Sequence, residues 1–375
     1  RDARRDEFFD GCERHLLRRM HTWEPEDLVE LCCALARDGS QEGAQLLRGV
    51  LFRVDRLVPQ LSGAALLRFI ETCALRGLRE HDPKRPDLFQ VATPRLAECV
   101  GAFGAPEISR IAAVYRQLNL ADSVPLFEAL GARLLVLLQG GPAPPRRQER
   151  RSPRRAPPRG RDAPGDIAVV PTSAAAPAPV PATRRGRRGQ EPDSAVVAAM
   201  SFLTACGRLN IITQEVEPIF ELVAPIVRKR RDVGHLTALA QLSAKFGLAR
   251  KTEADRVLSA VCACFEEGPP EPASKATRGY ASQVVYGQLL LALVFNEAVC
   301  RIRDRALVMA VSAVHATFAG RVPALDARLA RQLQVAGLAC RLERPDAQQD
   351  LEHRGLDAFL EEVRELDSEE AFTTR

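Results

Sequence analysis

The sequence predicts an all-α protein in which helical hairpins stack as an α-solenoid, with repeats of about 37 to 42 residues and one Arg/Pro-rich interruption. Three observations lead to this prediction. Apolar residues recur with the 3.6-residue period of helices, and almost no segment alternates as strands do. One apolar frame returns along the chain. Its copies end in Gly or Asn, which tolerate the left-handed conformation that closes a helix.

The clearest copy of the frame spans residues 26–39, where Leu28, Leu31 and Leu35 fall on one helical face before Gly39. Weaker copies begin at Leu66, Ile108, Ala199, Leu236 and Val285 and end at Gly77, Asn119, Asn210, Gly247 and Asn296. The first apolar positions are 38 (28 to 66), 42 (66 to 108) and 37 (199 to 236) residues apart. An interval of this size is typical of helical-hairpin repeats.

A second helix follows each of these first helices. The amphipathic segments that predict it are 45–57, 88–100, 124–138, 216–227 and 254–265. Such a hairpin cannot bury both apolar faces alone, so we expect neighbouring units to stack in register. The alternative is an irregular helical domain whose similar helices share a spacing by chance.

The chain divides into four parts. Residues 1–139 form a predicted N-terminal repeat block that starts with a capping helix, and residues 194–345 form a C-terminal block. Between them, residues 140–193 are a predicted disordered linker or arm, and residues 346–375 are a predicted acidic capping helix and tail. We expect Trp23 to pack at the first hairpin; a base-stacking platform is the alternative.

The positive charge is concentrated in the arm. Residues 140–190 hold twelve arginines against three acidic residues, a net of +9, so the remainder sums to 5 − 9 = −4. Clustered arginines gain counterion release wherever they meet phosphates, which predicts RNA contact. The predicted RNA-binding residues of the arm are Arg146, Arg147, Arg150, Arg151, Arg154, Arg155, Arg184, Arg185, Arg187 and Arg188. A solvated linker or a tail for an acidic protein surface are the alternatives.

A second cationic cluster lies at the end of the predicted helix over 216–227, which is the second helix of the first repeat after the arm. It consists of Arg228, Lys229, Arg230 and Arg231. Part of this cluster complements the helix dipole. Four cations in succession exceed what the dipole requires, so we add them to the predicted phosphate contacts.

Catalytic and metal-binding patterns are missing from the sequence. The ten cysteines include no CxxC pair, the six histidines are dispersed, and there is no P-loop, HExxH or nucleophile elbow. We therefore expect buried structural thiols, no catalytic residues, no metal, no cofactor and no small-molecule substrate. The longest apolar run, near residues 289–295, is too short to span a membrane, so no membrane insertion is expected.

The copies at Asp27–Gly39, Ala65–Gly77 and Leu236–Gly247 resemble the degenerate repeats of organellar octotricopeptide and heptatricopeptide proteins and of FAST-kinase-like proteins. No RAP domain follows them here. The aligned positions do not agree, since Glu30 stands where the other two copies have Arg68 and Arg110, so no base-reading residue carries over.

The resemblance implies a protein of the mitochondrial matrix or, alternatively, a plastid, and the start at Arg1 is compatible with a removed transit peptide. We therefore expect a non-catalytic component of an organellar ribonucleoprotein, the mitochondrial ribosome first, with rRNA and neighbouring proteins as partners. A protein-binding scaffold of another organellar complex and a free RNA-processing factor are the alternatives.

Overall fold

A computed structural model describes residue 11 and residues 22–38, 58–75, 88–141, 191–248, 251–266, 278–294, 301–318 and 325–365. Within these residues every regular element is a helix, so the prediction of an all-α protein is confirmed. The α-helices are α2 (Pro25–Asp38), α4 (Gly63–Leu75), α5 (Leu88–Cys99), α6 (Ala105–Leu118), α7 (Val124–Leu138), α8 (Glu191–Leu209), α9 (Val216–Arg230), α10 (Val233–Lys245), α11 (Thr252–Glu266), α12 (Arg278–Val294), α13 (Arg301–Phe318), α14 (Ala327–Glu343), α15 (Pro345–His353) and α16 (Leu356–Glu365). Two 3₁₀ turns, η2 (Val58–Gln60) and η3 (Val100–Ala102), precede α4 and α6.

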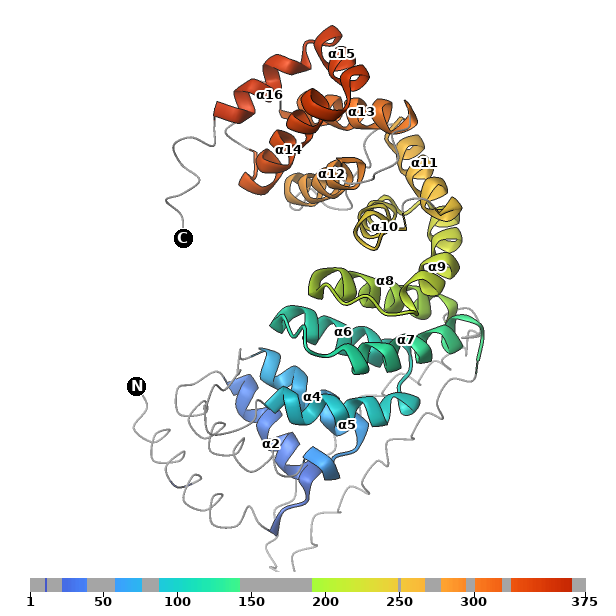
Figure 1. The fold of residues 1–375 in the computed structure, drawn as a ribbon. Helices are drawn as coiled ribbons and strands as arrows, with labels where there is room; N and C mark the ends of the chain where they lie inside the picture. The colour runs from blue at the N-terminus through green and yellow to red at the C-terminus, as the bar shows by residue number, and fades with distance from the viewer. Residues whose placement is uncertain are drawn as a thin grey trace, which may run out of the picture.

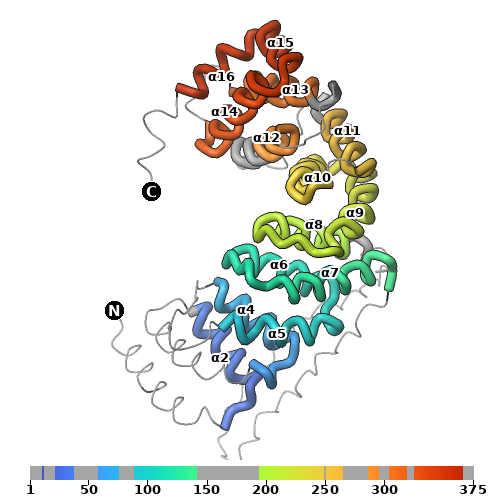
Figure 2. The backbone as a smooth tube through the Cα atoms, in the orientation of Figure 1, coloured from blue at the N-terminus to red at the C-terminus, as the bar shows by residue number. Residues whose placement is uncertain are grey.

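The helices form two layers. In the first layer α2, α4, α6, α8, α10, α12 and α14 each pack against the next, and in the second layer α5, α7, α9, α11, α13 and α15 do the same. Contacts between α4 and α5, α6 and α7, α8 and α9, and α10 and α11 join the layers. Figure 1 and the backbone trace of Figure 2 show the helices following an arc, with α8, α10 and α12 on its inner side and α9 and α11 on its outer side.

The six helices that carry the recurring apolar frame, α2, α4, α6, α8, α10 and α12, all belong to the first layer, which α14 extends without a copy of the frame. Each predicted second helix that falls within the described residues belongs to the second layer, as α5, α7, α9 and α11. The predicted second helix over 45–57 and nearly all of the predicted N-terminal capping helix lie outside the described residues. Trp23 is half-buried and packs against the core, which favours the packing role over a base-stacking platform.

Three of the six predicted stop signals lie in the described residues and have the expected left-handed backbone, while Gly39, Gly77 and Asn296 lie outside the described residues. Asn119 has a φ of +55°, Asn210 one of +58° and Gly247 one of +68°. At the other end of α6, the Glu107 carboxylate accepts a hydrogen bond of 3.0 Å from the Gly104 amide, which satisfies a donor that the helix leaves unpaired. The helix boundaries are therefore encoded locally.

The helices α4, α6 and α8 lie parallel and in register, because their contacts join equivalent or adjacent positions of the frame. The Gln117 amide donates to the Ala74 carbonyl over 3.4 Å, and the Ser201 hydroxyl donates to the Ser109 carbonyl over 3.1 Å. The second contact bridges α6 and α8, the helices on either side of the arm. The first-layer packing thus continues across the point at which the arm is inserted.

The core contains aliphatic, aromatic and thiol side chains. Tyr115 lies edge-on to Phe89 and Phe127, and its hydroxyl is 2.7 Å from that of Thr93. Cys32, Cys73, Cys206 and Cys340 are buried without disulfides, as expected for structural thiols. Burial raises the pKa of the Cys32 thiol to about 12 and that of the Cys340 thiol to about 11.

The C-terminal end differs from the prediction of one capping helix. Gly355, with a φ of +67°, separates α15 from α16, and α16 packs back on α14. Arg344, between α14 and α15, is 4 % exposed and pairs with Asp304 of α13 over 3.1 Å. Its guanidinium also donates to the Leu293 carbonyl at the end of α12 over 2.7 Å. In the described part of the chain, no helix is long and apolar enough to cross a membrane.

Candidate functional site

The exposed surface of the first layer is the part of the molecule that the repeated frame organises. Four positions of the frame are exposed or half-buried in each of α2, α4, α6, α8 and α10. Relative to the first apolar residue of the copy, they are positions −2, +2, +5 and +9. We call this surface, on the inner side of the arc, the inner face. It consists of Glu26, Glu30, Cys33, Arg37, Ala64, Arg68, Glu71, Leu75, Pro106, Arg110, Ala113, Gln117, Val197, Ser201, Thr204, Arg208, Gly234, Ala238, Gln241 and Lys245.

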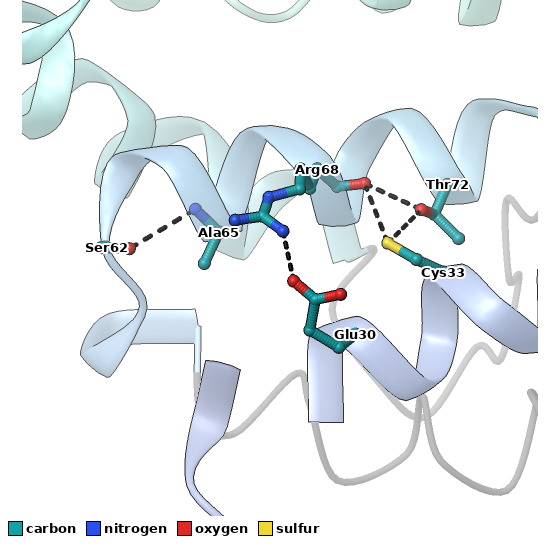
Figure 3. Close-up of polar contacts among 6 residues, drawn as sticks. All are labelled: Glu30, Cys33, Ser62, Ala65, Arg68 and Thr72. Atoms are coloured by element: carbon teal, nitrogen blue, oxygen red, sulfur yellow. Dashed lines mark hydrogen bonds and ion pairs between the residues drawn. The ribbon is translucent and has the colours of Figure 1, made fainter. Parts of the chain in front are cut away.

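Two ion pairs link neighbouring helices on this face. Arg68 of α4 pairs with Glu30 of α2, and Arg110 of α6 binds both carboxylate oxygens of Glu71 of α4, one of them over 2.5 Å. Figure 3 shows the first pair reaching from α4 down to α2. The hydrogen bonds to Glu71 are the main cause that raises the pKa of Arg110, so this guanidinium stays charged. Partly exposed pairs of this kind add little stability, but a bidentate pair fixes the position of the guanidinium.

A cavity of about 400 Å³ opens on the inner face among α2, α4 and α6. Its lining combines cationic, polar and apolar groups: Cys33, Ala36, Arg37, Arg68, Glu71, Thr72, Leu75 and Arg110. The Cys33 thiol lies 3.1 Å from the Thr72 hydroxyl, which in turn donates to the Arg68 carbonyl over 2.8 Å, as Figure 3 shows. The volume lies within the range of sites for small ligands.

A row of cations occupies one edge of the first layer. Arg37, Arg116, Arg208 and Lys245 lie in the last turns of α2, α6, α8 and α10. Because α2, α4, α6 and α8 are parallel, Arg37, Arg116 and Arg208 lie along the same edge, with no cation from α4 between the first two, and Lys245 ends the next helix of the layer. Each cation complements the partial negative charge of its own helix end, and together they form a positive strip along the edge. We call this strip the cationic edge.

The predicted cluster after the arm lies on the second layer. Arg228 is half-buried and pairs with Glu253 of α11 over 2.9 Å, and Glu253 also pairs with Arg256 over 2.6 Å. Lys229, Arg230 and Arg231 are exposed at the end of α9, where Arg231 has a φ of +54°. The guanidinium of Arg228 therefore joins α9 to α11, and three cations of the cluster face solvent.

The predicted RNA-binding arginines of the arm lie outside the described residues. They are Arg146, Arg147, Arg150, Arg151, Arg154, Arg155, Arg184, Arg185, Arg187 and Arg188. The described structure does fix where the arm is inserted: it follows α7 and precedes α8, two helices that pack against each other.

Sequence reasoning missed the cavity and the ion pairs, although a signal for the pairs was present. Glu30 and Arg68 occupy the same frame position in successive units, and Arg110 occupies it in the third. Unlike residues at one frame position argue against a shared role in reading bases. Opposite charges at equivalent positions of stacked parallel helices instead predict pairing between neighbours, and that inference could have been drawn.

The described residues contain no group of His, Cys, Asp and Glu side chains that could hold a metal ion. The chain matches none of the known protein-family models, and no curated protein sequence is significantly similar to it. The function must therefore be argued from the surface itself.

Proposed function

We propose that the chain is a non-catalytic, RNA-binding structural component of an organellar ribonucleoprotein, with the mitochondrial ribosome as the first candidate. In this proposal the two layers are an α-solenoid with repeats of about 37 to 42 residues. The arm and the exposed cations of the Arg228–Arg231 cluster neutralise phosphate, while the body contacts neighbouring proteins. RNA is the main partner, and the mitochondrial matrix is the compartment.

One observation carries the proposal, which is the uneven distribution of charge. The arm has a net charge of +9 in a chain of only +5. A polycationic segment gains affinity for phosphates by releasing their counterions. The cationic edge adds ordered positive groups on the body, spaced by the stacking of the first-layer helices.

A second candidate function, a protein-binding scaffold, is favoured by the exposed side of α14. Val335, Leu338 and Leu342 recur there with helical spacing, and Leu338 and Leu342 are 52 % and 73 % exposed. Arg328 and Arg331 extend the same stripe toward the start of the helix. Exposed aliphatic groups beside cations suit an acidic amphipathic partner segment. This surface fits the protein contacts of a ribonucleoprotein component as well as those of a scaffold.

The test compares RNA binding by three full-length chains: the natural one, one with the twelve arm arginines changed to Gln, and one with them changed to Lys. We expect the logarithm of the affinity to fall steeply with the logarithm of salt concentration for the natural and Lys chains, by about 0.7 per phosphate contacted, and to fall weakly for the Gln chain. Crosslinking in the native source should recover rRNA from ribosome-sized particles.

Two results would contradict the proposal. Salt-insensitive RNA binding that is equal in all three chains would remove the role of the arm. Recovery of a stable protein complex that contains no RNA would identify the chain as a scaffold.

A further inference from the structure

We infer that the cavity on the inner face binds a nucleotide through a terminal phosphate, with Arg37 as the main phosphate ligand. The inference deepens the proposed function and rests on it for the source of the nucleotide, which is the phosphorylated end of an RNA strand. A free nucleoside monophosphate offers the same chemistry.

The charge of the lining selects an anion. Arg37, Arg68, Arg110 and Glu71 line the cavity, and Glu30 pairs with Arg68 beside it, so these five side chains sum to a charge of +1. A terminal phosphate carries a charge close to −2 at neutral pH, whereas a phosphodiester carries −1. A phosphomonoester therefore gains more from this positive site than the backbone of a continuous strand does, because its charge is larger.

The three guanidinium groups differ in how far they are engaged. Arg68 is paired with Glu30, and Arg110 is held on both oxygens of Glu71. Arg37 is exposed and takes part in none of the ion pairs that join described residues. An anion can therefore bind Arg37 without displacing a carboxylate of the described chain. Arg68 and Arg110 are already fixed in position, and they add positive potential and further hydrogen-bond donors.

The rest of the lining suits the apolar part of a nucleotide. Leu75, at the end of α4, is 78 % exposed, the largest exposed fraction among the large exposed hydrophobic residues of the described chain. Ala36 and Cys33 add apolar surface on α2. A base placed against these side chains would cover surface that water now contacts, and arginine side chains are good stacking partners for bases.

The position of the cavity fits a strand end. Arg37 belongs both to the cavity and to the cationic edge, whose other members are Arg116, Arg208 and Lys245. A strand whose terminal nucleotide enters the cavity can continue along this edge, where its diester phosphates meet single cations.

The test measures binding of the full-length chain to a fluorescent ten-nucleotide RNA that carries either a 5′-phosphate or a 5′-hydroxyl, with AMP and UMP as competitors. We expect the phosphorylated RNA to bind about tenfold or more tightly, since a charge-assisted contact contributes about 1.5–3 kcal/mol. Arg37→Gln should abolish this preference. Arg208→Gln is the matched control, because it removes one exposed cation of the same edge outside the cavity; it should weaken both RNAs equally and keep the preference.

Each outcome is decisive. Equal affinity for the two RNAs in the natural chain would overturn the inference and leave the proposed function standing. A preference that survives Arg37→Gln would also overturn it, because another site would be responsible. Absence of RNA binding, together with AMP or UMP binding that Arg37→Gln abolishes, would support the cavity as a free-nucleotide site and overturn the proposed function. Circular dichroism and the unfolding midpoint verify that both variants fold, as expected for exposed positions.

Discussion

Among the described residues, both ends of the helical array have exposed ion pairs between helices, but the C-terminal end also has a buried one. Between α2, α4 and α6 the pairs Glu30–Arg68 and Glu71–Arg110 are largely open to solvent and border a cavity. Among α12, α13 and α14 the pair Arg344–Asp304 is buried, with side chains 4 % and 11 % exposed. Exposed pairs can exchange partners at small cost, whereas a buried pair that loses one member leaves a charge without compensation. The buried pair therefore gives structural support, and the exposed pairs leave their charges accessible to a ligand of the kind proposed above.

The exposed stripes of two first-layer helices also differ. The stripe on α4 contains Arg68, Glu71 and Leu75, while the stripe on α14 contains two arginines followed by Val335, Leu338 and Leu342. The stripe on α14 therefore has three large exposed aliphatic residues where the stripe on α4 has one, and it presents the more apolar surface of the two.

Removal of the buried charge should have the largest effect. We expect Arg344→Met to lower the free energy of unfolding by about 3–5 kcal/mol, because Asp304 and the Leu293 carbonyl lose their partner in a buried site. Denaturant unfolding measures the loss. The double variant Arg344→Met, Asp304→Leu should recover most of it, and Arg341→Met, which breaks the exposed pair with Glu361, should cost less than about 1 kcal/mol. A small effect of Arg344→Met alone would remove the contrast between the two regions.

The buried thiols of both regions should make the free energy of unfolding depend on pH, with an effect of intermediate size. Below pH 9 the thiols are protonated in the folded and unfolded chains, so they contribute no pH dependence. Above it, the unfolded chain loses these protons while folded Cys32 holds its own to about pH 12, so stability falls with rising pH by about 1.4 kcal/mol per unit for each such thiol. Unfolding measured across this window should show a flatter decline for Cys32→Ala, and for Cys340→Ala up to about pH 11.

An unchanged slope in both thiol variants would mean that these cysteines titrate normally in the folded chain. A change in Cys32→Ala alone would place the tightly packed thiol in the N-terminal region only. Either result would contradict the expectation that buried thiols at both ends of the array resist ionisation.

The smallest effect is expected at the exposed pair. Glu30→Gln should change the free energy of unfolding by less than about 1 kcal/mol, and the difference from the natural chain should vanish at high salt. Thermal unfolding at low and high salt measures it, with Glu26→Gln, on the same side of α2, as the control. A loss of more than about 2 kcal/mol in the free energy of unfolding would show that the Glu30–Arg68 pair stabilises the fold as a buried pair does, and would contradict the contrast between exposed and buried pairs.

Local features of the sequence were sufficient for the all-α class and for most helix ends. The period of Ile108, Ile111 and Tyr115 followed by Asn119 identifies both the buried face of α6 and its last turn. The break at Gly355 was missed, because the apolar positions on either side of it continue one helical pattern. A single Gly after a short amphipathic run can be a helix interior or a stop, and only the packing of α16 on α14 decides between them.

The cavity and the buried ion pair could not have been predicted from local sequence. Arg344 reaches Asp304, 40 residues away, and Leu293, 51 residues away, so no spacing rule marks it. The cavity needs the relative placement of three helices, since its cations come from α2, α4 and α6. Periodicity tells which residues face outward, but not which outward-facing residues of different helices meet.

The contact between α7 and α8 has a consequence for how the arm can change. The helices at its two ends, α7 and α8, pack against each other, so the arm closes a loop between two points that the helical body holds together. The free-energy cost of closing such a loop grows only with the logarithm of its length, by about 0.6 kcal/mol for each doubling. Insertions and deletions there should be nearly neutral for stability, so the length of the arm and the number of its arginines can change without unfolding the body.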